Sequence, residues 1–91
     1  MTISYDPAKR AQTLAQRGLD FEDAATVLGG PRYTVTDDRK PYGEQRFQTY
    51  GLLHDRLVIL VWTWRGDTRH IISMRKCNDR EQAKYGRELG S

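Results

Sequence analysis

An eight-residue segment that is apolar on both of its faces is the strongest constraint on how this chain folds. In residues 57–64, the even positions are all apolar, and so are the odd positions apart from a single threonine. Because side chains of a strand alternate between two faces, such a strand needs cover on both faces of a sheet. The segment is much shorter than the roughly 20 residues that cross a membrane as a helix. We therefore expect it to be the central strand of a sheet.

Segments with a period of two lie on both sides of this strand. We predict further strands over residues 33–36, 44–50 and 69–75, separated by turns that contain glycine or aspartate. In the last of them, strict alternation places Arg69, Ser73 and Arg75 on one face. His70 and Met74 then lie on the other face. We expect four antiparallel strands, with residues 1–5 as a candidate for a further short edge strand.

Helix signals stand near both ends of the chain. Asp6-Pro7 is typical of a helix start, since aspartate caps free amides and proline gives up a donor that has no partner there. This helix carries an apolar stripe at positions 8, 11, 14 and 15 and ends at Gly18; a second runs from Asp20 to Gly29, and a short third follows Asn78. The predicted fold class is α+β, with two N-terminal helices, an antiparallel four-stranded sheet and a C-terminal helix. We expect one domain over residues 1–91.

Composition excludes several kinds of site. The chain holds one cysteine and two histidines, too few for an internal disulfide or for a Cys/His zinc site. The sequence has no nucleophile elbow, no phosphate-binding P-loop and no histidine pair at helical spacing. We therefore expect no metal and no other cofactor. Without an apolar signal stretch at the N-terminus, we expect a cytoplasmic protein that has no membrane contact.

Positive charge is concentrated in the last third of the sequence. Residues 1–64 hold eight basic and eight acidic side chains, whereas residues 65–91 hold seven basic and four acidic ones. The seven basic residues are Arg65, Arg69, Arg75, Lys76, Arg80, Lys84 and Arg87. Arginine predominates among them, and its planar fork of donors suits phosphate. This bias fits a nucleic-acid surface about as well as a solvated strand edge and helix face.

These basic side chains, with one carboxylate beside them, suit the cleavage of RNA without a metal ion. In that reaction the 2′-hydroxyl attacks its own phosphate, so the enzyme supplies a base, cations for the developing charge and an acid for the leaving oxygen. Arginine stabilises the charge but does not take a proton, because its pKa exceeds about 12. The base is therefore sought among Glu44, Lys9 and His54.

Several short motifs, in this order and at this spacing, are together typical of one family. They are Asp6-Pro7-Ala8-Lys9, Gly18-Leu19 with Phe21-Glu22 and Ala24, Gly43-Glu44-Gln45-Arg46-Phe47, Gly51, Arg69-His70-Ile71-Ile72-Ser73-Met74-Arg75-Lys76, Glu81 and Tyr85. With this pattern over nearly its whole length, the chain resembles the BrnT-type toxins of bacterial type II toxin-antitoxin systems. The Arg-x-Ile-Ile-Ser-x-Arg strand is the most specific of the motifs.

The resemblance implies a RelE-like fold and a ribonuclease that arrests growth. It also implies neutralisation by a cognate BrnA-type antitoxin with a ribbon-helix-helix domain, in a heterotetramer that contacts operator DNA through the antitoxin. We expect Arg46, Arg69 and Arg75 to hold the phosphate of the RNA. Either Lys9 or Glu44 would then transfer protons, and the further RNA contacts would be Arg65, Lys76 and Tyr85.

Other hypotheses stay open beside this one. Members of the family commonly have histidine where Arg17 stands and asparagine where Thr13 stands, and arginine does not accept a proton. The alternative function is therefore a non-catalytic module that binds nucleic acid or protein and retains the fold and the antitoxin interface. A repressor that binds DNA alone is disfavoured, because no helix-turn-helix or ribbon-helix-helix pattern is visible. We expect the antitoxin to cover the helical layer and the basic face.

Overall fold

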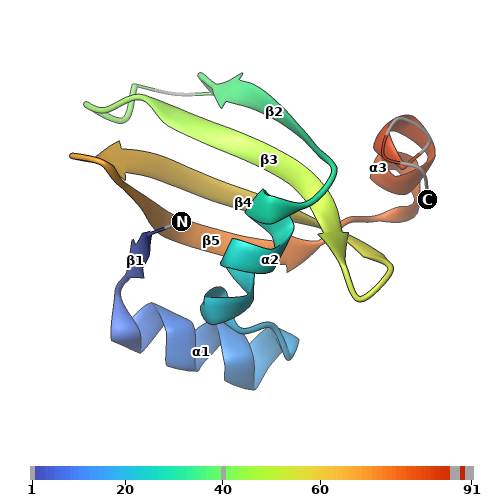
Figure 1. The fold of residues 1–91 in the computed structure, drawn as a ribbon, viewed down its shortest axis with the longest axis horizontal. Helices are drawn as coiled ribbons and strands as arrows, with labels where there is room; N and C mark the ends of the chain where they lie inside the picture. Colours follow the sequence, from blue (N-terminus) through green and yellow to red (C-terminus); the bar gives the residue numbers. More distant parts are fainter. Residues whose placement is uncertain (1, 40, 87–88, 90–91) are drawn as a thin grey trace.

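The sheet at the centre of the molecule has the strand order β1-β5-β4-β3-β2 (Figure 1). The computed structural model describes residues 2–39, 41–86 and 89, so Arg87 of the basic last third lies outside the described residues. The elements are β1 (Ile3–Tyr5), α1 (Pro7–Arg17), the 3-10 turn η1 (Phe21–Asp23), α2 (Ala24–Gly29), β2 (Arg32–Asp37), β3 (Arg46–Leu53), β4 (Arg56–Arg65), β5 (Thr68–Lys76) and α3 (Asp79–Tyr85). None of the helices in these ranges has the length and apolar character needed to cross a bilayer.

The predicted antiparallel four-stranded sheet beside two N-terminal helices is wrong. Across the described residues the sheet has five strands and is mixed, and three helices accompany it. β1 pairs with β5 in parallel, with Ser4 opposite His70, while every other pair of neighbouring strands is antiparallel. A segment of three residues is too short for its period to show either that it joins the sheet or in which direction.

The N-terminal helices follow their predicted caps, with one interruption. The side chain of Asp6 accepts a bond of 2.9 Å from the amide of Ala8, and α1 ends at Gly18, whose φ of 68° is left-handed. Asp20 accepts from the amide of Glu22 at 3.0 Å and so starts a 3-10 turn instead of an α-helix. The predicted second helix is therefore split into η1 and the shorter α2.

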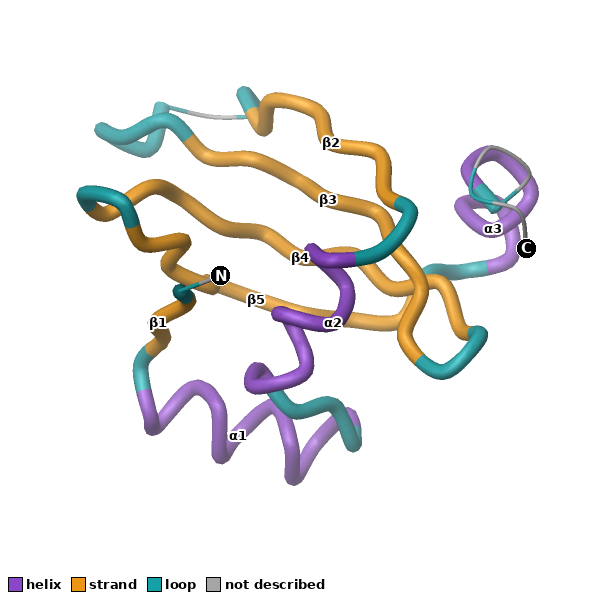
Figure 2. The backbone as a smooth tube through the Cα atoms, viewed as in Figure 1, coloured by secondary structure: helices purple, strands orange, loops and turns teal. Residues whose placement is uncertain are grey.

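Two layers of side chains cover the central strand β4 on opposite faces. On the face that packs against η1 and α2, Phe21 and Leu28 meet Leu60, Ile71 and Met74 in a fully buried core. We call this face the helical face and the opposite one the open face. The pair α1 and α2 lies on one side of the sheet, while α3 stands apart at the other end (Figures 1 and 2).

Within residues 2–39, 41–86 and 89, the open face has a smaller core at one of its ends. There the buried side chains of Tyr50, Leu57 and Ile59 form a cluster with Cys77, and Tyr85 of α3 packs against it. The sequence-based expectation that β4 is covered on both faces is thus confirmed at this end of the sheet. The other end of the open face is available for polar side chains.

One bulge reverses the predicted orientation of an arginine in β5. Val61 of β4 pairs with Ser73, but the next residue Trp62 pairs with Ile71, so Ile72 has no opposite partner. Because an extra residue shifts the alternation by one, Arg69 lies on the helical face, whereas Ser73 remains on the open face. The prediction that Arg69 and Ser73 share a face is therefore wrong.

Candidate functional site

A row of polar side chains crosses all the strands of the sheet on the open face. The pairing places Asp37 opposite Arg46, Arg46 opposite Thr63, Thr63 opposite His70 and His70 opposite Ser4. Residues paired across a sheet point to the same side, so all five share the open face. We call these five residues the polar row. No other row of this face carries both a histidine and an arginine among the described pairs.

His70 is the titratable centre of the polar row. Its Nδ1 lies 2.9 Å from Ser4 Oγ, a bond that fixes the orientation of the ring. Burial lowers the pKa of His70 first, and the positive charge of Arg65 lowers it further. The carboxylate of Glu44 opposes these effects, whereas Lys9 adds to them. A histidine whose pKa lies below its usual value is neutral near pH 7 and has a ring nitrogen free to accept a proton.

The loop that precedes β3 folds over the polar row. Arg46 Nε lies 3.2 Å from Glu44 Oε2, and its guanidinium carbon lies 4.0 Å from the centre of the Tyr42 ring. Thr63 Oγ1 donates a bond of 2.7 Å to the carbonyl of Gln45, which ties the loop to β4. The guanidinium of Arg46 is therefore held between a ring and a carboxylate, two strands away from His70 in the same row, with about a quarter of its side chain exposed (26%).

A buried carboxylate closes the row at β2. The side chain of Asp37 is fully buried and accepts bonds of 2.7 and 2.8 Å from Arg39. The hydrogen bond from this guanidinium holds the pKa of Asp37 below its usual range, although burial acts in the opposite direction. Asp37 is thus paired and ionised, and it does not compete with His70 as a base.

Arg75 belongs to a second group of side chains at the other end of the open face. It forms two bonds of 2.8 Å to Glu81 of α3, and these hold the pKa of Glu81 at about 2. Glu81 Oε1 also accepts from the amide of Asn78, which completes the capping box of α3. Arg75 lies five residues along β5 from His70, a distance of roughly 15 Å. The predicted phosphate ligands therefore do not converge on one point.

Tyr85 stands in this second group, with its ring against the sheet. Its centroid is 4.0 Å from that of Tyr50, and the rings are nearly parallel at 21°. Tyr33, which pairs with Tyr50 across the sheet, has its ring centroid 5.5 Å from that of Tyr85. One face of the Tyr85 ring therefore packs against the sheet, and Lys84 Nζ lies 5.2 Å from its centroid, so the side chain is only partly exposed.

Two of the predicted site residues lie on the helical face. Arg69 sits with its guanidinium carbon 5.1 Å from the Trp62 ring and 4.8 Å from the Trp64 ring. Its Nε is buried and has no hydrogen-bond partner among the described residues. Lys76, for which RNA contact was predicted, is exposed on the helical face and lines a pocket there. Neither side chain is on the face that carries His70.

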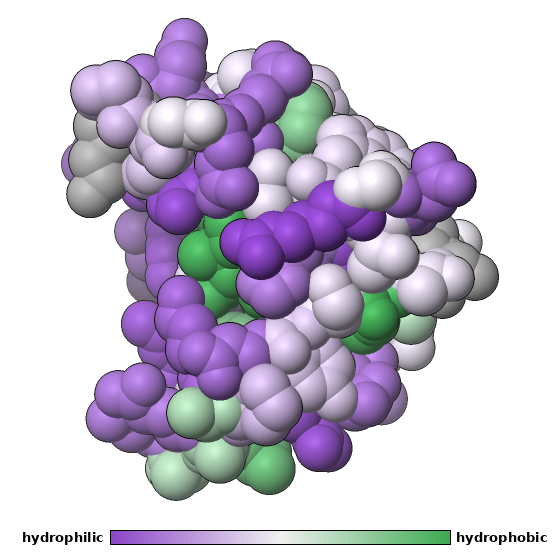
Figure 3. Space-filling model, turned by 90° about the vertical axis from the view of Figure 1, so that its left-hand side faces the viewer, coloured by the Kyte–Doolittle hydropathy of each residue, from purple (hydrophilic) through white to green (hydrophobic). Residues whose placement is uncertain are grey.

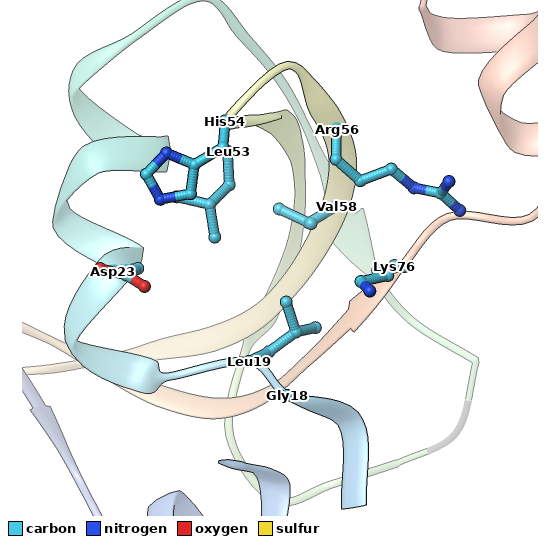
Figure 4. A pocket seen from close by; sticks show the side chains of 8 residues that line it. All are labelled: Gly18, Leu19, Asp23, Leu53, His54, Arg56, Val58 and Lys76. Carbon is cyan, nitrogen blue, oxygen red and sulfur yellow. The ribbon is translucent and has the colours of Figure 1, made fainter.

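That pocket has a volume of about 500 Å³ and opens beside the C-terminal end of α1 (Figure 4). Its wall consists of Gly18, Leu19, Asp23, Leu53, His54, Arg56, Val58 and Lys76. Figure 4 shows the imidazole of His54 on one side of this hollow and Arg56 and Lys76 on the other, with the apolar side chains between them. His54, a predicted base candidate, is thus part of a different site from His70.

Of the predicted residues, the structure gathers Lys9, Glu44, Arg46 and Arg65 around the polar row and leaves the others apart. Sequence reasoning missed His70 because strict alternation places it with Met74, on the face opposite Arg69, Ser73 and Arg75. The one available signal was the pair Ile71-Ile72, which interrupts the period of two and coincides with the bulge.

Comparison with known proteins gives one match. The model of a protein family described as "Ribonuclease toxin, BrnT, of type II toxin-antitoxin system" matches residues 5–81. No curated protein matches the chain. The matched span contains all the residues of the polar row except Ser4, and it extends to Glu81 in α3.

Proposed function

Because the chain belongs to the BrnT family of ribonuclease toxins of type II toxin-antitoxin systems, we propose that it cleaves RNA at the polar row without a metal ion. The observation that carries this proposal is the position of His70. It is a half-buried histidine with a lowered pKa, oriented by Ser4 and close enough to Arg65 and Glu44 for both to influence its charge. A neutral imidazole beside fixed cations is what transfer of a 2′-hydroxyl proton requires.

The chemistry follows from this placement. With Nδ1–H donated to Ser4 Oγ, Nε2 of His70 takes the proton of the 2′-hydroxyl as that oxygen attacks the adjacent phosphorus. Arg46 and Arg65 stabilise the negative charge that develops on the phosphorane. The bond from phosphorus to the 5′-oxygen breaks, and the ammonium of Lys9 supplies the proton to this leaving oxygen. The products are a 2′,3′-cyclic phosphate and a 5′-hydroxyl.

The remaining predicted residues receive supporting roles. Glu44 positions the guanidinium of Arg46 and moderates the pKa of His70, so we no longer assign it the role of base. Arg75 holds α3 against the sheet through Glu81, and the partly exposed side chain of Tyr85 contacts RNA. Family membership also supports a ribbon-helix-helix antitoxin, in whose absence the free toxin arrests growth.

The test is cleavage of RNA by the purified chain in buffer with and without EDTA. We expect 2′,3′-cyclic phosphate ends in both buffers and no cleavage at a position that carries a 2′-deoxy nucleotide. His70→Asn keeps a donor for Ser4 but has no basic nitrogen, and we expect a loss of at least about 100-fold in rate. Arg80→Ala, on the exposed side of α3, is the matched control and should cleave at the normal rate.

Cleavage that EDTA abolishes would contradict the metal-free mechanism, and an active His70→Asn variant would contradict the assignment of the base. Intact RNA in the presence of a folded, RNA-binding chain would instead favour the non-catalytic module. Induced expression of the chain, alone and together with its antitoxin, tests the toxin function in cells. Arrest that the antitoxin relieves is the expected result.

A further inference from the structure

The apolar side of α1 faces solvent. Ala8, Ala11 and Ala15 are exposed, Leu14 is exposed to 46%, and no residue of this helix is buried. A surface helix normally turns its apolar stripe toward the core. Figure 3 shows pale and deeper green atoms gathered at the lower end of the molecule, the level at which Figure 1 places α1. This stripe therefore has no cover within the described part of the chain.

Polar bonds explain why α1 is held in this orientation. Arg10 donates bonds of 2.7 and 3.0 Å to Asp20, and the pair holds the pKa of Asp20 at about 2. Arg17 Nη1 donates a bond of 2.8 Å to the carbonyl of Met74 in β5. These bonds fix the basic side of α1 against the body, so that the apolar side turns outward.

The stripe leads to the pocket beside Lys76. Positions 8, 11, 15 and 18 lie along one side of a helix, and Gly18 both ends α1 and lines the pocket. The pocket has an apolar floor that includes Leu19 and Val58, and its rim carries Arg56 and Lys76. The exposed stripe of α1 and this pocket form one surface, which we call the α1 surface.

The charge of the α1 surface determines which kind of partner can bind to it. Lys9 on α1 and Arg56 and Lys76 at the pocket rim bring positive charge to the α1 surface, whereas Arg10 is paired with Asp20 and Arg17 is bonded to the Met74 carbonyl. Asp23 is the one carboxylate in the described pocket wall. A second copy of this chain would bring the same three positive groups to the contact, which is unfavourable. A segment with apolar side chains for the stripe and the pocket, and with carboxylates beside them, is complementary in both respects.

We propose that the α1 surface is where the antitoxin binds, through one acidic segment with apolar anchor residues. This inference relies on the proposed function only for the identity of the partner. The stripe begins at Ala8, next to Lys9, so a segment bound along it reaches the edge of the polar row and shields the cation that serves the leaving oxygen. The polar row itself lies on the opposite face of the sheet from the pocket.

Two matched pairs of variants test the proposal by titration calorimetry with the purified protein encoded beside this chain as the probe. Ala11→Glu and Gln16→Glu add the same charge to exposed positions on different sides of α1. Lys76→Glu and Arg80→Glu reverse a charge at the pocket rim and on α3, respectively. We expect Ala11→Glu and Lys76→Glu to weaken binding by at least about tenfold, and each control by less than about twofold.

Each outcome has a distinct meaning. Equal affinity for all four variants and the unaltered chain would overturn the α1 surface and leave the toxin function standing. A probe that does not bind the unaltered chain would overturn the partnership on which the proposal rests. Melting curves establish that all variants are folded. Because calorimetry does not depend on ribonuclease activity, an inactive but antitoxin-binding chain would refute the proposed reaction alone.

Discussion

The proposed chemistry depends on the protonation state of one histidine, His70, and its neighbours shift the pKa of this side chain in opposite directions. Burial and Arg65 lower the pKa of His70, while Glu44 raises it. A base must be unprotonated to act, so the cleavage rate should increase with pH and level off above the pKa of His70. The midpoint of this rise is expected below the usual pKa of histidine, about 6.5.

Two substitutions should move this midpoint in opposite directions. Removing the carboxylate in Glu44→Gln takes away the group that raises the pKa of His70, so the midpoint should shift to lower pH. Removing the cation in Arg65→Gln should shift it to higher pH, in addition to lowering the maximum rate. Cleavage rates measured between pH 4 and 8 check both shifts. Two shifts in the same direction would mean that a different group titrates.

Among the elements, α2 and β3 approach each other so closely that one position must remain glycine. A Cβ atom at Gly51 would lie 2.6 Å from Val27 Cγ1, well inside van der Waals contact. Gly51→Ala should therefore destabilise the fold by about 1–3 kcal/mol. Gly29→Ala is the matched control, since its Cβ would meet nothing within 4 Å. Urea denaturation compares the two variants.

A second substitution separates this clash from a general effect of alanine in a strand. Shortening the opposing side chain in Val27→Ala makes room for the new methyl group. The double variant Gly51→Ala with Val27→Ala should therefore be more stable than the sum of the two single changes predicts. Strict additivity would show that the close approach of α2 and β3 is not the cause.

Local signals in the sequence predict where most of the helices and strands lie, but not how the strands pair with one another. The caps at Asp6 and Asn78 and the double-sided apolar strand depend on neighbouring residues, and the structure has them where the sequence predicts them. The parallel pairing of β1 and the bulge at Ile72 depend on distant partners, for which a period of two gives no signal.

For the candidate site, too, the sequence predicts some features and not others. The chemistry of the side chains alone points to Glu44, Arg46, Arg65 and Lys9. In the structure Glu44, Arg65 and Lys9 lie near enough to His70 to act on its charge, and Arg46 is paired with Glu44. Because of the bulge, Arg69 and His70 lie on the faces opposite to those that strict alternation predicts. Arg69, the predicted phosphate ligand, is on the helical face, and His70, the proposed base, is on the open face. A residue's chemical type can be read from the sequence, whereas its face requires the register of the whole strand.

At the scale of the whole molecule, ion pairs of the same kind hold the helices near both ends of the chain in place. Arg10 and Asp20 join α1 to the segment that leads into η1, and Arg75 and Glu81 join β5 to α3. In both pairs the guanidinium holds the pKa of the carboxylate at about 2. Both carboxylates therefore keep their charge in the folded protein well below the pH at which they become protonated in the unfolded chain, about 4.

The stability of the protein should consequently decline as the solution is acidified. A carboxylate with a lowered pKa in the folded state contributes its full stabilisation above the unfolded pKa and loses it as pH falls through the folded pKa. Burial lowers the pKa of His70, so its contribution is also lost as pH falls below about 6.5, the value in the unfolded chain. The melting temperature should therefore begin to decrease below about pH 6.5 and fall most steeply between about pH 4 and pH 2. The double variant Asp20→Asn with Glu81→Gln should melt lower at pH 7 and show a much flatter decline. The slope that remains belongs to Asp37, whose pKa Arg39 also holds below its usual range, and to His70, whose pKa is lowered by burial. An unchanged slope in the double variant would show that these two ion pairs do not control the acid stability of the fold.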